Sequence, residues 1–190
     1  MAKKIFGIIG KQGSGKNTFV ESISKVLPER SLEHIKSGSI LVDVLRTLAL
    51  PVTRQNLQAL AESLKNTFGS NVISRTIFTK IVNSKADIVV FDAIRWKADE
   101  EMLRQFPGSQ LVYIDTKKEI RYQRLRNRNE KEDENDLSWD QFERSEAAST
   151  EIDIDKISIR ADHILTNNGT ESDFIQQVKL FLAKHYIMMD

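Results

Sequence analysis

The amino-acid sequence predicts an α/β fold of three layers, in which helices cover both faces of a parallel five-stranded sheet. Short and continuously apolar runs, typical of strands that are buried on both faces, recur along the chain. Amphipathic stretches separate these runs, and strands that alternate with helices pair in parallel. The expected strands are Ile5–Ile9, Leu32–Ile35, Ile88–Phe91, Gln110–Ile114 and His163–Thr166.

The expected helices are placed by apolar stripes and by residues that cap helix ends. The first helix, Lys16–Val26, follows the first strand. Thr53 is a good N-cap for a helix over Arg54–Lys65, and Ser138 is one for a helix over Trp139–Ala148. The other expected helices are Ile40–Leu48, Asn71–Val82, Lys97–Phe106, Lys117–Arg128 and Ser172–His185.

Two stretches depart from the plain alternation of strands and helices. Residues 38–83 hold a run of helices, and residues 121–148 combine a basic helix, a charged segment poor in apolar residues and a short helix. No internal repeat or low-complexity linker divides the sequence. We therefore expect a single domain over residues 1–190, with both stretches as inserts on one α/β core.

Composition narrows the classes of function. The chain has 190 residues, 28 Lys and Arg against 27 Asp and Glu, and no cysteine. Disulfides and thiolate metal sites are excluded, and a balanced charge favours neither nucleic acid nor a membrane as partner. The apolar run after Lys3 and Lys4 is too short for a signal peptide. We expect a cytoplasmic protein, a monomer or small homo-oligomer, that acts on small molecules.

A glycine-rich loop follows the first strand and opens the first helix. The segment Gly10–Thr18 reads GKQGSGKNT, close to the phosphate-binding pattern G-x-x-x-x-G-K-[ST]. Glycines allow positive φ, so the backbone N–H groups turn toward phosphates, while Lys16 reaches the β- and γ-phosphates. The expected ligands of a nucleoside triphosphate are Gly10, Gln12, Gly13, Ser14, Gly15, Lys16, Asn17 and Thr18.

One position of this loop differs from the pattern. Asn17 stands where the pattern has the Ser or Thr that contacts Mg²⁺, and a threonine, Thr18, follows one residue later. Either the Thr18 hydroxyl or the Asn17 amide oxygen would then meet the metal.

The loop resembles that of adenylate kinases, where a residue without a hydroxyl also separates Lys from Thr. The segment Phe91–Arg95, FDAIR, resembles the Asp-Gly-x-Arg segment of P-loop nucleotide kinases. The remaining order, to Ala161–Ile164 and Asn168–Thr170, resembles dephospho-coenzyme A kinases and their archaeal-type relatives. The resemblance implies an ATP-dependent phosphotransferase that uses Mg²⁺, with residues 38–83 as the acceptor-binding insert and 121–148 as the lid.

The strand that ends near Asp92 supplies two further candidates. Ligands of such folds bind beyond the carboxyl ends of strands, so Asp92 is expected to face the metal, directly or through water. The resemblance makes Arg95 the arginine that binds the acceptor phosphate, and places Arg46 and Arg54 in the acceptor-binding region. A turn-capping aspartate and ordinary surface arginines are the alternatives for these residues.

The basic helix supplies the lid cations. Arg124 and Arg128 lie four residues apart and share a helical face. In the relatives, such arginines bind donor phosphates, and a turn like Asn168-Gly169 lies near the donor adenine. The alternative is a solvated helix face balanced by nearby acids. The expected catalytic residues are therefore Lys16, Asp92, Arg95, Arg124 and Arg128.

The nature of the acceptor follows from what the sequence lacks. A hydroxyl acceptor needs a base, and the stretch after the second strand, His34–Ser39, holds no acid; Asp43 is the nearest. A nucleoside monophosphate is already an anion near neutral pH and needs cations instead, because the second pKa of its phosphate is ~6. We therefore expect a nucleoside or deoxynucleoside monophosphate kinase, with a dephospho-coenzyme A kinase or a non-catalytic nucleotide-binding regulator as alternatives.

Overall fold

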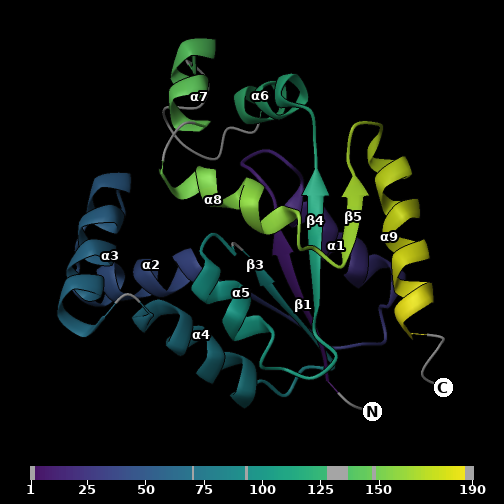
Figure 1. Ribbon diagram of the computed structural model, residues 1–190, viewed down its shortest axis with the longest axis horizontal. Coiled ribbons are helices and arrows are strands. Elements are labelled where there is room, and N and C mark those ends of the chain that lie inside the picture. The colour runs from purple at the N-terminus through teal and green to yellow at the C-terminus, as the bar shows by residue number, and fades with distance from the viewer. Residues whose placement is uncertain (1–2, 70, 93, 128–136, 147–148, 187–190) are drawn as a thin grey trace.

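A parallel five-stranded sheet forms the centre of the molecule, as predicted. The computed structural model describes residues 3–69, 71–92, 94–127, 137–146 and 149–186. The strands are β1 Lys4–Ile9, β2 Leu32–Lys36, β3 Ile88–Asp92, β4 Gln110–Asp115 and β5 His163–Thr166. They pair in the order β2-β3-β1-β4-β5, every pair parallel. All carboxyl ends therefore point to one end of the molecule (Figure 1).

Helices cover both faces of this sheet. The helices are α1 Lys16–Val26, α2 Ser37–Thr47, α3 Arg54–Phe68, α4 Val72–Asn83, α5 Lys97–Leu103, α6 Lys118–Asn127, α7 Trp139–Glu146, α8 Ser149–Ser158 and α9 Glu171–Tyr186. Two apolar cores result, because β1 sends Phe6 and Ile8 to one side and Ile5 and Ile9 to the other. Helices α1 and α9 pack over the first core, and α4, α5 and α8 over the second. This explains why the strands read as continuous apolar runs.

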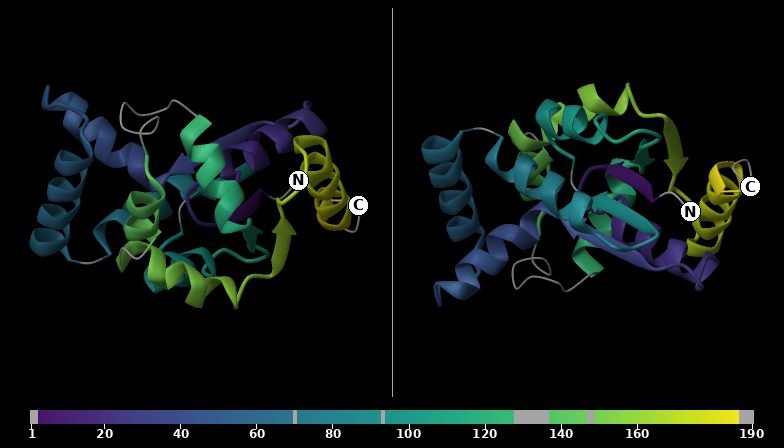
Figure 2. Two further views of the ribbon diagram at one scale, coloured as in Figure 1. Left: turned by 90° about the horizontal axis from the view of Figure 1, so that it is seen from above. Right: turned by 90° about the horizontal axis from the view of Figure 1, so that it is seen from below.

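Helix α3 lies apart from the sheet centre (Figure 2). Both views of Figure 2 place α3 at the end of the molecule opposite α9. The predicted cap of α3 is confirmed, since the Thr53 hydroxyl accepts a hydrogen bond from the backbone N–H of Asn56 at 3.1 Å. The cap of α7 is confirmed as well, with Ser138 accepting from the N–H of Gln141 at 3.2 Å.

Several helices differ from their predictions. Helix α3 continues to Phe68 and not to Lys65, and α5 ends at Leu103 and not at Phe106. Helix α2 begins at Ser37 and not at Ile40, since polar residues that lack an apolar stripe form its first turn. Helix α8 was not predicted, because acidic residues interrupt its apolar pattern; Ile154 and Ile157, three residues apart, fill the core beside α4 and α5. Of the helices in the described part of the chain, none is both long and apolar enough to cross a membrane.

Candidate functional site

The loop between β1 and α1 has the conformation of a phosphate cradle. Gly13 and Gly15 have φ of 76° and 98°, values that only glycine adopts easily. Gly15 is the N-cap of α1 and offers no side chain to its first turn, so the helix N-terminus is open to an anion. The Lys16 Nζ donates to the carbonyl oxygens of Gly10 at 2.7 Å and Lys11 at 3.2 Å. The lysine therefore folds back over the loop, where bound phosphates would lie.

One side of the loop is fixed by buried hydrogen bonds to the carbonyl oxygen of Ser14. This oxygen accepts from the Thr116 hydroxyl at 3.0 Å and from Asn167 Nδ2 at 2.8 Å. Thr116 follows β4, and Asn167 follows β5. A Cβ added to Gly15 would meet Asn167 Nδ2 at 2.2 Å, so the Asn167 side chain lies directly against the backbone of Gly15. The ends of β4 and β5 thus hold the loop in place.

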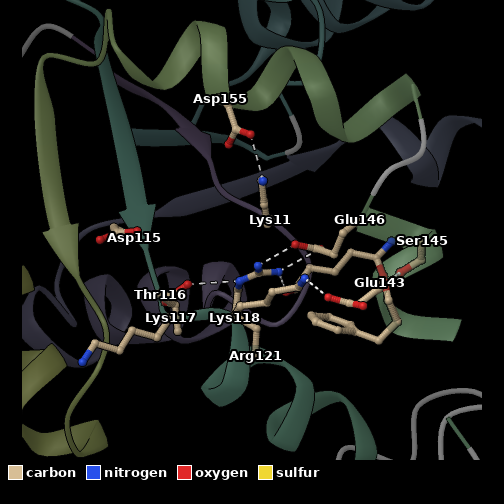
Figure 3. Close-up of polar contacts among 12 residues, drawn as sticks. Lys11, Asp115, Thr116, Lys117, Lys118, Arg121, Glu143, Ser145, Glu146 and Asp155 are labelled. Carbon is tan, nitrogen blue, oxygen red and sulfur yellow. Dashed lines mark hydrogen bonds and ion pairs between the residues drawn. The ribbon is translucent and has the colours of Figure 1, made fainter. Parts of the chain in front are cut away.

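Arg121 of α6 extends the same network. Its guanidinium donates to the carbonyl oxygens of Gln12 at 3.2 Å and Thr116 at 3.1 Å, and forms a bidentate ion pair with Glu146 of α7 at 2.5 and 2.8 Å (Figure 3). Both side chains are buried, at 5% and 11% exposure. Arg121 therefore joins the loop to α6 and α7, and four of its five N–H donors are used in doing so.

Asp92 ends β3 beside the loop and is held by a histidine. The carboxylate is 5% exposed, and its Oδ2 lies 3.1 Å from Nε2 of His34 on β2. Its other oxygen, Oδ1, has no hydrogen-bond partner among the described residues. Burial raises the pKa of Asp92, but the hydrogen bond to His34 and the charges of Lys16 and Lys36 outweigh it, so the net shift is downward. The site therefore presents an ionised carboxylate oxygen.

These residues fit a magnesium ion that is shared with substrate phosphates. Mg²⁺ takes oxygen ligands and usually binds through one or two carboxylates plus phosphates and water. Asp92 supplies a buried carboxylate oxygen that no described residue contacts by a hydrogen bond, and Thr18 supplies a hydroxyl in the first turn of α1. In the described segments, no group of three or more metal-ligating side chains forms a complete cage. Asp92 and Thr18 would thus hold the ion, and the ion would neutralise phosphate charge.

Asn17 is already engaged in a contact that the sequence did not suggest. Its amide Oδ1 accepts a hydrogen bond of 2.9 Å from Nζ of Lys36, the last residue of β2. Of the two candidates for the metal contact, Asn17 is therefore the less available one.

The expected lid cations have different positions. Arg124 Nη2 donates to Asn167 Oδ1 at 3.2 Å, next to the loop, while its Nη1 is buried without a hydrogen-bond partner among the described residues. Burial lowers the pKa of Arg124. Arg126 is exposed and lies over the ring of Tyr122, and Arg128 falls outside the described residues. Arg124 is thus the cation of α6 that the structure brings to the loop with donors still to satisfy.

The acceptor-side arginines are less closely gathered. Arg95 is half-buried after β3, and its backbone N–H donates to the buried carboxylate of Asp99 at 3.2 Å. Arg46 is exposed in the last turn of α2. Arg54 begins α3, and its side chain is not described. Arg95 alone of these candidates therefore follows directly on the strand that carries Asp92, and the roles of all three stay predictions.

The turn after β5 is joined by a hydrogen bond to the residues that follow β4. Asn168 Oδ1 accepts from the backbone N–H of Lys117 at 2.8 Å, which ties this turn to the end of β4. A Cβ on Gly169 would meet Asp173 Oδ2 at 2.8 Å. The turn thus lies beside Asn167 and the loop, while its contact with a donor base stays a prediction.

Five residues that build this site were not predicted from the sequence: His34, Lys36, Thr116, Glu146 and Asn167. His34 and Lys36 could have been found from the strand pairing, because β2 and β3 are parallel and Lys36 pairs with Asp92. Thr116, Asn167 and Glu146 gave no signal, since their contacts join segments that are far apart in sequence.

A glycine loop with its lysine, between the first strand and helix of a parallel five-stranded sheet, defines a P-loop protein with the fold of small kinases. A family model described as an AAA domain matches residues 9–142, which is most of the chain. The chain therefore belongs to this AAA domain family.

Relatives and solved structures agree with this class. The chain is 25% identical over 182 residues to a UPF0200 protein of Thermococcus gammatolerans, covering 93% of each chain. It is similar in structure to a shikimate kinase from Acinetobacter baumannii in complex with shikimate, with a TM-score of 0.55, 17% identity and coverage of 98% and 96%. It is also similar in structure to a gluconokinase from Sinorhizobium meliloti, with a TM-score of 0.58 and 13% identity. That match covers 99% of this chain and 98% of the gluconokinase chain. At these identities the two structures establish the fold.

Proposed function

We propose that the protein is an ATP-dependent kinase that transfers the γ-phosphate to a nucleoside or deoxynucleoside monophosphate. The observation that carries this proposal is the charge at the carboxyl end of β2. Lys36 ends this strand beside the loop, and the stretch His34–Ser39 that follows from β2 into α2 holds no acid that could act as the base for a hydroxyl acceptor. A monophosphate acceptor is already an anion near neutral pH and needs no such base.

The residues of the site divide the work between donor and acceptor. The loop N–H groups and Lys16 hold the donor phosphates, and a bound Mg²⁺ would neutralise charge on them through Asp92 and Thr18. Arg95 and the insert, with Arg46 and Arg54, receive the acceptor phosphate. Arg124 lies beside the loop to stabilise the charge on the transferring group. Transfer then needs only orientation, exclusion of water and charge stabilisation, without a covalent intermediate.

A kinase with a hydroxyl acceptor is the second candidate, and one specific observation favours it. Asp92 is buried and ionised, and its Oδ1 has no hydrogen-bond partner in the described part of the chain, so it can accept a proton as well as bind a metal. Asp43, the candidate base from the sequence, is exposed on α2. In both readings the reaction consumes ATP, and we expect it to take place in the cytoplasm.

One experiment tests the proposal. The protein is incubated with ATP, Mg²⁺ and each nucleoside and deoxynucleoside monophosphate, dephospho-coenzyme A, shikimate or gluconate, and the products are identified by mass. We expect a diphosphate from at least one monophosphate. Lys16→Met is expected to lower kcat by about 10²–10³, the usual loss when one stabilising group is removed.

The control for this loss is Lys25→Met, since Lys25 lies in the same helix but forms an exposed ion pair with Glu171. We expect it to keep the turnover of the unmodified protein. A product formed only from a hydroxyl acceptor would replace the first candidate by the second. ATP binding without transfer to any acceptor would favour a regulatory protein.

A further inference from the structure

Lys36 lies where the donor loop, β3 and the helical insert meet. It ends β2 and pairs in register with Asp92, and the next residue begins α2. Its Nζ donates to Asn17 Oδ1 in the first turn of α1. Its charge, with that of Lys16, helps to lower the pKa of Asp92, so both ammonium groups lie near this carboxylate. The site thus has one lysine from the loop and a second lysine from the end of β2.

The contact that holds Lys36 is easily exchanged. Asn17 is exposed and Lys36 is half-buried, so water competes for their hydrogen bond. An ammonium group has three N–H donors, and the described residues use one of them. A phosphate oxygen is a stronger acceptor than a neutral amide, because both partners are then charged. The ammonium group therefore gains by turning from Asn17 to a phosphate.

The strand from which Lys36 enters the site indicates which phosphate of the donor it contacts. Lys16 folds back over the loop toward the end of β1, with its Nζ on the carbonyl oxygen of Gly10. Lys36 comes from β2, the outer strand next to the helical insert. The γ-phosphate is the end of the donor that points toward the acceptor, and it is thus the group that Lys36 reaches.

We propose that Lys36 is a phosphate-binding residue that leaves Asn17 when a nucleoside triphosphate binds and contacts the γ-phosphate from the end of β2. The inference rests on the proposed use of a triphosphate donor, but not on the identity of the acceptor. It also gives Asn17 a role: the amide oxygen holds the ammonium group in place while the site is free of ligand.

Binding measurements without an acceptor test this assignment. The affinities of ADP and of the non-hydrolysable β,γ-imido analogue of ATP are measured by calorimetry in one magnesium buffer. For Lys36→Met and Lys36→Gln, we expect the imido analogue to bind about tenfold more weakly, the loss of one charge-assisted hydrogen bond. ADP lacks the γ-phosphate, and its affinity should change less than about twofold. Lys36→Arg keeps the charge and should lose less than either variant.

The glutamine variant separates ligand binding from a structural role. Its amide can still donate to Asn17 Oδ1, but it has no charge for a phosphate. Lys179→Met, which removes an exposed cation on α9, is the control for net charge and should bind both ligands as the unmodified protein does. Lys36→Gln binding the imido analogue normally, or losing both ligands equally, overturns the assignment. An unmodified protein that binds neither ligand overturns the proposed function itself.

Discussion

The two sides of the phosphate loop are held in different ways. On the β4 and β5 side, Thr116, Asn167 and Arg121 donate to the loop carbonyls, and each is at most 7% exposed. On the β2 side, the loop helix is joined by a hydrogen bond from Lys36 to the exposed Asn17. We call these the fixed side and the open side of the loop.

The difference indicates how the site separates stability from ligand binding. Buried hydrogen bonds and buried ion pairs are costly to break, because a polar group or a charge is then left without a partner in the protein interior. A contact between partly exposed groups is cheap to exchange. The fixed side thus keeps the loop carbonyls in place before any ligand arrives. On the open side, Asp92 Oδ1 is available to a metal ion and the Lys36 ammonium group to a phosphate.

The largest expected effect is on the fixed side. Arg121→Met removes the guanidinium that joins Gln12, Thr116 and Glu146. It leaves a buried carboxylate without its partner, so the free energy of unfolding should fall by about 3–5 kcal/mol. Urea denaturation measures this loss.

A neighbouring lysine on the same helix provides the control. Lys118 forms an ion pair with Glu143, and both side chains are more than a third exposed. Lys118→Met should change the free energy of unfolding by less than about 1 kcal/mol. Equal losses for Arg121→Met and Lys118→Met would show that the fixed side is not fixed by its buried ion pair.

The second prediction concerns the close approach of Gly15 and Asn167. An alanine at residue 15 must adopt a φ of 98°, and its Cβ would lie 2.2 Å from Asn167 Nδ2. Gly15→Ala should therefore lower the free energy of unfolding by about 2–4 kcal/mol, the sum of backbone strain and of displaced hydrogen bonds.

A substitution at a second glycine measures the backbone strain alone. Gly108 has a φ of 74°, but a Cβ there would meet nothing within 4 Å. Gly108→Ala should cost about 1–2 kcal/mol, the strain alone. If Gly15→Ala is no worse than Gly108→Ala in thermal denaturation, Asn167 yields freely and does not hold the loop.

The fold could be predicted from the sequence because its signals are local. The continuous apolar strands, the loop glycines and the caps at Thr53 and Ser138 each depend on neighbours in sequence. Helix α8 was missed because its buried pair, Ile154 and Ile157, stands among acidic residues.

Of the site, only the residues that belong to a sequence motif could be predicted. Gly13 and Gly15 have the positive φ that the motif predicts, and Asp92 lies at the end of β3, while the roles of Lys16 and Asp92 stay predictions. The fixed side depends on pairs such as Arg121 with Glu146, which meet only when α6 and α7 pack together. An arginine on a basic helix looks the same in sequence whether it faces a phosphate or a buried carboxylate.

The smallest expected effect is on the open side, and two asparagines make the comparison direct. Asn17→Ala removes an exposed amide whose partner, Lys36, can turn to water, so the free energy of unfolding should change by less than about 0.5 kcal/mol. Asn167→Ala removes the same chemical group from a residue that is 4% exposed, and leaves the Ser14 carbonyl and Arg124 each with one hydrogen bond fewer. That variant should lose about 1–3 kcal/mol. Both are measured by thermal denaturation without ligand. If Asn17→Ala is as destabilising as Asn167→Ala, the Lys36 contact is part of the folded framework, and the two sides of the loop do not differ as described.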